Sequence, residues 1–300
     1  MKPIKSTSLL PMILQSIGIG IIGILFPVAY IFLPMIFLTE AIDKGLVKIM
    51  GTFLGLCLFL ELLIPKLGMT IFTLFGPLIL ILHYCLVTKK DFERTFSLAS
   101  GIFVISIMLT LQSTGVLDFI RQEDFPQKLI AMQKEAGIWQ EGMEAYLPTF
   151  ENVMRKGVQY LPGLVVIISL LVTYLTMTFT GRKLLLRGKI VVQPSSFFYF
   201  RLPKGLLFVM ALFSLGAAAF SKELSQSAPL LVNNGILVAG FLFFVQGLAV
   251  MDFLFIKLKI LQIFKTILLV MIVFTPIVQV PIAFLGLCDS IFNLRRIHIK

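Results

Sequence analysis

The chain has 300 residues, of which 58% are hydrophobic and 14% are charged, and its formal net charge is +11. Because a soluble domain carries about 25% charged residues, this composition excludes a soluble globular protein and points to a membrane protein surrounded by lipid. The lysines and arginines lie mostly in short connections between apolar runs, a distribution typical of multi-pass membrane proteins and not of nucleic-acid-binding surfaces.

The first apolar run, residues 8–38, is too long for one upright helix, because about 20 residues cross a hydrocarbon core of about 30 Å. Pro27 and Pro34 predict a break near its middle. We expect a hairpin with both ends on one side, and a single bent helix is the alternative. The run lacks a small-residue cleavage site, which favours a retained segment over a signal peptide. Its G-x-G-x-x-G pattern at 18–23 is better explained by helix packing than by dinucleotide binding.

Three further spans are predicted at residues 46–64, 68–87 and 95–111. Glu61 lies near the end of the first of them, and His83 lies inside the second. An ionisable residue in or near a span is a functional candidate, because a charge in lipid is costly. The connection at 88–94 is rich in basic residues.

A long polar insert follows at residues 112–160, and in it acidic residues outnumber basic ones. This balance predicts an extracytoplasmic location. Apolar residues recur at helical spacing in its first half, which predicts an amphipathic helix that lies on the membrane or caps the bundle: Phe125, Leu129, Met132 and Ala136.

The next span is predicted at 159–180, and the connection after it, residues 181–204, contains basic residues and no acid. This asymmetry places the connection in the cytoplasm, on the same side as 88–94 and opposite the insert. Its first cations are candidates for docking a soluble partner or anionic lipid headgroups: Arg182, Lys183, Arg187 and Lys189.

Spans at 205–220 and 231–255 precede a last apolar run at 260–294, which Pro276 and Pro281 interrupt. A second hairpin there places both chain termini in the cytoplasm. The fold prediction is therefore an all-α polytopic transmembrane helix bundle of about eight to ten segments with broken terminal hairpins. It divides into N-terminal transmembrane helices, the extracytoplasmic insert and C-terminal transmembrane helices with the basic loop, at residues 1–111, 112–160 and 161–300.

Signatures of enzymes are absent from the sequence. His83 and His298 are the two histidines, and the three cysteines lie far apart, so neither a metal site nor a disulfide framework is predicted. The sequence has no G-x-S-x-G turn, C-x-x-C pair or phosphate-binding G-x-x-x-x-G-K motif. We therefore expect no catalytic residue, no metal, no cofactor and no enzymatic activity.

Several polar residues in the apolar runs either line a polar cavity or pair helices with one another. Asp252 has candidate partners in Lys257, at i+5, and in Arg295 or Arg296 from the last run. The candidate residues are Glu61, His83, Asn233, Gln246, Asp252 and Asp289, and the same two interpretations apply to Gln15, Gln112, Asn234 and Gln279.

The last third of the chain resembles the YybS-like family of predicted bacterial membrane proteins, a family of unknown function. The motifs that carry the resemblance are G-L-A-V-M-D-F at 247–253, L-G-L-C-D at 285–289, F-N-L-R-R at 292–296 and F-R-L-P at 200–203. The resemblance implies a multi-pass protein of the bacterial plasma membrane and implies no activity. At the level of fold alone, the pattern is also similar to the substrate-binding membrane subunits of energy-coupling-factor vitamin transporters.

Two functions follow from these observations. The first is a non-enzymatic transporter-like or partner-binding membrane subunit, with Asp252 and Asp289 in a polar cavity and the basic loop as a docking site. The alternative is a membrane scaffold or assembly factor that recruits a protein partner and binds no small ligand. The lipid bilayer surrounds the protein in both. The first has a cytoplasmic or membrane protein as a partner, whereas in the second the acidic insert at 112–160 engages an extracytoplasmic partner and the aspartates hold helices together.

Overall fold

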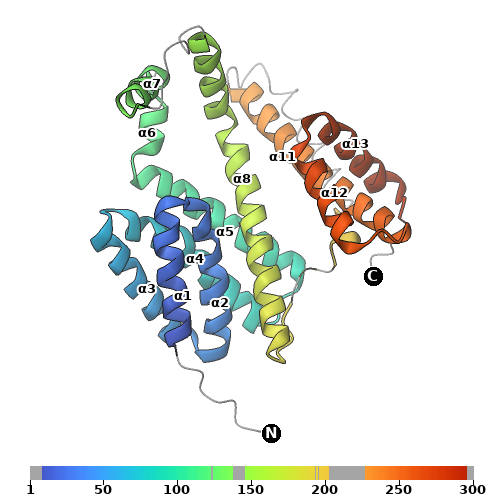
Figure 1. The fold of residues 1–300 in the computed structure, drawn as a ribbon, viewed down its shortest axis with the longest axis horizontal. Helices are drawn as coiled ribbons and strands as arrows, with labels where there is room; N and C mark the ends of the chain where they lie inside the picture. The colour runs from blue at the N-terminus through green and yellow to red at the C-terminus, as the bar shows by residue number, and fades with distance from the viewer. Residues whose placement is uncertain are drawn as a thin grey trace. The chain divides into compact units, whose positions relative to one another are not determined.

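The computed structural model describes residues 9–122, 124–137, 146–192, 194, 196–202 and 227–295. All regular elements in these ranges are helices, so the predicted all-α helix bundle is confirmed (Figure 1). The chain forms two compact units. Unit 1 comprises Met1–Gln140 and Ile168–Pro194, and unit 2 comprises Glu141–Ile167 and Ser195–Lys300.

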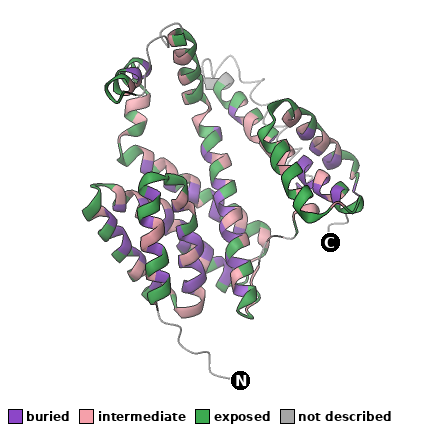
Figure 2. Cartoon of the chain, in the orientation of Figure 1, coloured by how far each residue is buried: buried purple, intermediate pink, exposed green. Residues whose placement is uncertain are grey.

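Unit 1 is a bundle of apolar helices joined by short turns. Its elements are α1 (Leu10–Leu25), η1 (Pro27–Ile31), α2 (Phe32–Lys44), α3 (Leu46–Leu63), α4 (Leu67–Val87), α5 (Phe92–Ser113), α6 (Val116–Ile120), α7 (Phe125–Glu135) and the later part of α8 (Leu147–Leu186). Buried side chains from α2, α3, α4, α5 and α8 form one core, which includes Leu38, Phe53, Leu78, Phe103 and Met177. Figure 2 shows buried residues on the inner faces of these helices and exposed ones on the outer faces.

The first apolar run breaks at Pro27, where the sequence predicts a break. Helix α1 ends at Leu25, and the one-turn 3-10 helix η1 leads into α2. The Tyr30 hydroxyl donates a hydrogen bond to the Gly20 carbonyl at 3.2 Å. A Cβ atom on Gly23 would lie 2.3 Å from the Tyr30 ring. Gly20 and Gly23 therefore serve helix packing.

The described part of unit 2 contains the short helix η3 (Phe197–Tyr199), α11 (Ser227–Lys257), α12 (Gln262–Phe274) and α13 (Pro276–Phe292), besides the first part of α8. Helices α12 and α13 meet at a bend of 104°. Pro276 begins α13, because a proline lacks the N–H that would continue α12.

The described residues contain several helices of membrane-spanning length. In the described ranges five helices are long and apolar enough to cross a membrane, or six if the bent pair α12–α13 counts as one. The expected ten segments counted both halves of each terminal run, the expected eight counted each run as one bent helix, and α1, α2 and α12 have only 16, 13 and 13 residues. Each is shorter than the roughly 20 residues that a span needs. The predicted span at 205–220 lies outside the described residues.

The polar insert contains α6, α7 and the start of α8, while residues 138–145 lie outside the described part. The predicted amphipathic helix exists as α7, but its buried side differs from the predicted one. Phe125 and Ile130 are buried, whereas Met132 is 57% exposed. The inward face is confined to the first half of α7, where Phe125 also contacts Phe119 of α6 edge to face.

Candidate functional site

Two groups of polar side chains stand out in the described residues, one in each unit. In unit 2, Gln246 of α11 is fully buried in an apolar helix. Its Nε2 donates a hydrogen bond to Asp289 Oδ2 of α13 at 2.9 Å. Its Oε1 accepts one from the backbone N–H of Leu202 at 3.0 Å. One amide thereby joins two helices and the segment that follows η3.

Arg295 completes this group from the residues just after α13. Its Nη2 lies 2.7 Å from Asp289 Oδ2, and both side chains are 1% exposed. The same guanidinium donates to the backbone carbonyls of Phe198 at 2.6 Å and Phe200 at 2.7 Å. The Asp289 carboxylate therefore accepts hydrogen bonds from both the Gln246 amide and the Arg295 guanidinium. We call Gln246, Asp289 and Arg295 the α11–α13 clamp.

Glycines bring α11 and α13 close enough for the clamp to form. A Cβ atom on Gly247 would lie 1.9 Å from the Ile282 carbonyl oxygen, and one on Gly286 would lie 1.9 Å from that of Phe243. Only glycine fits such backbone contact. These pairs also show that the two helices run antiparallel.

Asp252 forms a second buried ion pair, but not with a predicted partner. Its Oδ1 lies 2.8 Å from Lys265 Nζ of α12, with side chains 7% and 11% exposed respectively. Lys257 is exposed, Arg295 binds Asp289, and Arg296 lies outside the described residues. Lys257 is a poor partner because it lies at i+5, which is not a neighbouring position on a helix.

Of the two adjacent asparagines, Asn234 is the one whose side chain joins α8 to α11 within unit 2. Asn233 is exposed, whereas Asn234 is buried. The Asn234 Oδ1 accepts a hydrogen bond from the Gly163 N–H at 2.6 Å, and its Nδ2 donates to the Gln159 carbonyl at 2.8 Å. A Cβ atom on residue 163 would lie 2.8 Å from Asn234 Oδ1, so glycine at this position permits the close approach.

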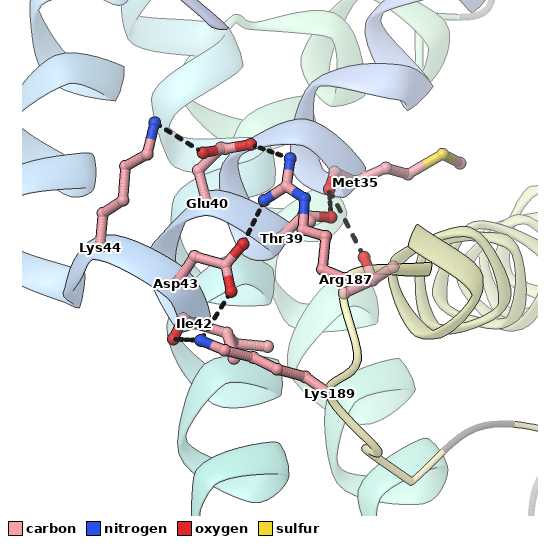
Figure 3. A network of polar contacts seen from close by, with 9 residues as sticks. Met35, Thr39, Glu40, Ile42, Asp43, Lys44, Arg187 and Lys189 are labelled. Carbon is pink, nitrogen blue, oxygen red and sulfur yellow. Dashed lines mark hydrogen bonds and ion pairs between the residues drawn. The ribbon is translucent and has the colours of Figure 1, made fainter. Parts of the chain in front are cut away.

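The second polar group lies in unit 1, where α2 and α8 end (Figure 3). Glu40 Oε1 lies 2.6 Å from Arg187 Nη2, and Glu40 Oε2 lies 2.9 Å from Lys44 Nζ. Asp43 pairs with Arg187 and, at 2.7 Å, with Lys189. We call Glu40, Asp43, Lys44, Arg187 and Lys189 the α2–α8 cluster.

Ion pairing keeps the members of this cluster charged. Burial by itself raises the pKa of the Glu40 carboxyl, but hydrogen bonds from Arg187 and Lys44 outweigh burial, and the pKa lies below its ordinary value. The pKa of Asp43 is lowered in the same way, because Lys189 and Arg187 outweigh the effect of burial. Burial opposes the charge of Arg187, yet its two carboxylate partners raise its pKa.

The remaining candidates lie apart from these groups. The Glu61 carboxylate accepts hydrogen bonds from the backbone N–H groups of Lys66 at 2.7 Å and Met69 at 2.9 Å, so it caps the turn between α3 and α4. His83, half-buried on α4, faces the backbone of Ala41. Arg182 is exposed and Lys183 is half-buried.

Sequence reasoning missed Glu40 and Asp43, the acidic half of the α2–α8 cluster. A signal was present, because the basic connection after α8 has no acid of its own and a buried cation needs a carboxylate from elsewhere. Among the described residues no group of three His, Cys, Asp or Glu side chains is placed to hold a metal ion. Both polar groups contain ion pairs that hold together segments distant in sequence.

A family model described as a predicted membrane protein (DUF2232) matches residues 9–290, a range that contains the α2–α8 cluster and both Gln246 and Asp289 of the clamp. No curated protein and no solved structure matches the chain.

Proposed function

Because the chain belongs to the DUF2232 family of predicted membrane proteins, we propose that it is a multi-pass, non-enzymatic membrane subunit that binds a protein partner. The partner docks on the end of unit 1 where α2 and α8 end, at Arg182 and Lys183 beside the α2–α8 cluster. The finer resemblance to the YybS-like family supports a location in the bacterial plasma membrane. The basic residues of the connection at 181–204 support placing this end in the cytoplasm.

The observation that carries this proposal is that the segment after α8 is fixed on unit 1. Arg187 and Lys189 bind the two acids of α2, and Val191 and Val192 pack against the core of unit 1. A surface that is ordered before binding loses less conformational entropy when a partner docks. This supports a binding surface rather than an unstructured connection.

Two cations remain beside the cluster for a partner to use. Arg182 and Lys183 form no ion pair with any carboxylate in the described part of the chain. Their neighbours Arg187 and Lys189 are already occupied by Glu40 and Asp43. An acidic partner surface would therefore meet Arg182 and Lys183 first, and such rim charges govern association rate and salt dependence.

The polar residues within the helices support a fixed bundle more than a moving transport site. Gln246, Asp289 and Arg295 bind one another, and Asp252 binds Lys265. A buried charge that is already paired strongly resists separation, because breaking the pair leaves an isolated charge. We therefore favour a scaffold whose polar groups hold its helices in register.

Photo-crosslinking tests the docking surface. A photo-crosslinking amino acid in place of Arg182 is expected to trap one protein partner, and the Lys183→Glu substitution is expected to abolish that product. The matched control places the same photo-crosslinking amino acid at position 66, in place of Lys66 at the N-terminal end of α4. Equal crosslinking from positions 182 and 66, or full crosslinking in Lys183→Glu, would refute the proposed surface.

A transporter-like subunit is the second candidate, and the break between α12 and α13 favours it. The two helices bend by 104°, and Gln279 Nε2 donates a hydrogen bond to the Val273 carbonyl across the break at 2.8 Å. Discontinuous helices with exposed backbone ends form substrate sites in many transporters. Uptake of a small molecule that depends on Gln279 would favour this function over the scaffold.

A further inference from the structure

Three helices of the chain end in the same backbone motif. After α4, the N–H of Lys90 donates to the Cys85 carbonyl at 3.0 Å and that of Lys89 to the Leu86 carbonyl at 3.3 Å. After α11, Ile260 and Lys259 make the equivalent bonds to Phe255 and Ile256, both at 3.0 Å. Gly188 and Lys189 repeat the pattern after α8. Each is a Schellman motif, in which the residue after the helix adopts a left-handed conformation.

Two of these three motifs place lysine where glycine is favoured. Gly188 has a φ of 77°, the usual solution, whereas Lys89 has a φ of 53° and Lys259 a φ of 57°. A left-handed conformation costs free energy for every residue with a Cβ atom. The example of Gly188 shows that glycine suits this motif in the same chain, so the lysines at the other two ends call for a reason beyond the turn itself.

The side chains of these turns are cationic and lack acidic partners. Lys89 and Lys90 follow α4, while Lys257 and Lys259 end α11, and within the described ranges none of the four forms an ion pair. Both helices are apolar and long enough to span the membrane. A lysine directly after such a span lies at the level of lipid headgroups, where its amine is attracted to anionic lipids.

We infer that the lysine-terminated ends of α4 and α11 are binding sites for the phosphate groups of anionic phospholipids. Lys89 with Lys90 forms one site in unit 1, and Lys257 with Lys259 forms the other in unit 2. At both sites the lysine amine binds a headgroup, and this binding offsets part of the cost of the left-handed backbone. This inference does not depend on the proposed partner surface, which uses other residues.

Lys66 provides a matched control, because it also has a positive φ, 69°, but lies at the N-terminal end of α4. The Lys66→Gly substitution relieves the same strain and removes the same charge at the other membrane face. The test compares unfolding temperatures of the full chain in nanodiscs of phosphatidylcholine with and without phosphatidylglycerol.

The unmodified protein is expected to unfold at a higher temperature when phosphatidylglycerol is present. Lys89→Gly and Lys259→Gly should each lose about 2 °C of this rise, while Lys66→Gly keeps all of it. In phosphatidylcholine alone, all three glycine variants should be at least as stable as the parent. Lys89→Arg, which keeps the charge, should keep the response.

Several results would overturn the inference. If phosphatidylglycerol did not raise the unfolding temperature of the unmodified protein, the proposed sites would be refuted. If Lys66→Gly lost as much of the rise as Lys89→Gly and Lys259→Gly, the effect would be one of charge in general. If inorganic phosphate added to phosphatidylcholine nanodiscs produced the same rise, the lysines would bind a soluble anion instead of a lipid.

Discussion

Asp289 and Arg295 form a closed ion pair of 2.7 Å whose side chains are each 1% exposed. The two residues are only six positions apart, but α13 ends between them, so the pair folds the chain back onto its own helix. Arg295 then reaches the carbonyls of Phe198 and Phe200, nearly a hundred residues earlier. One ion pair therefore organises three parts of unit 2.

Asp289→Asn should strongly destabilise unit 2. The substitution leaves the Arg295 guanidinium buried without a counter-charge, and breaking a buried pair in this way costs about 3–5 kcal/mol. Unfolding in detergent by a chemical denaturant would measure the loss. Asp124→Asn, which removes an exposed carboxylate paired with Lys128, should leave the stability nearly unchanged, because solvent screens an exposed ion pair. Equal effects of the two substitutions would contradict the clamp.

Gly247→Ala and Gly286→Ala should both separate α11 from α13. The added methyl group would lie 1.9 Å from a backbone carbonyl oxygen, and backbone cannot move aside as a flexible side chain can. We expect each to cost at least about 2 kcal/mol. Gly240→Ala, on the same helix with nothing within 4 Å of its added Cβ, should be neutral or stabilising. Thermal unfolding distinguishes them, and a stable Gly247→Ala variant would refute the close approach.

The α2–α8 cluster predicts a loss of stability in acid. The folded pKa values of Glu40 and Asp43 lie below their ordinary values of 4.5 and 3.8. A lowered carboxyl pKa stabilises the folded state above the ordinary pKa, and this contribution disappears as the pH falls through the folded pKa. The unfolding temperature should therefore fall as the pH is lowered below about 4.5. In Glu40→Gln,Asp43→Asn this fall should be smaller, and an unchanged pH profile would contradict the ion pairs.

Cysteine labelling tests the topology of unit 1. In a variant without its native cysteines, a cysteine at Ile190, which is 89% exposed, should react only from the cytoplasmic side. A cysteine at Met132, which is 57% exposed on α7, should react only from the opposite side. An impermeant thiol reagent applied to sealed cells and to inverted vesicles makes the comparison. Labelling of both positions from one side would overturn the orientation.

Local chemistry made the helices and their breaks predictable. Pro27 and Pro276 mark breaks because a proline removes a backbone donor wherever it stands, and long apolar runs must be helical to satisfy their backbone in lipid. The residues Gln246, Asp252 and Asp289 were identifiable as important for the same reason. A polar side chain in an apolar run needs a partner.

The partners themselves were not predictable, because they depend on how helices pack. Asp252 binds Lys265 only because α12 turns back beside the end of α11, and Arg295 reaches Phe198 only in the folded unit. Asn233 and Asn234 differ by one position and thus by about 100° around the helix. Only the packing of α8 on α11 selects Asn234.

Native mass spectrometry of the full chain, extracted gently from its own membrane, tests the central claim that this protein is a partner-binding scaffold with structural polar clamps. We expect a stoichiometric protein partner that is retained in Lys66→Glu and lost in the double variant Arg182→Glu,Lys183→Glu. A bound small molecule that disappears in a folded Gln279→Leu variant, with no protein partner, would contradict the account and identify a transporter-like subunit.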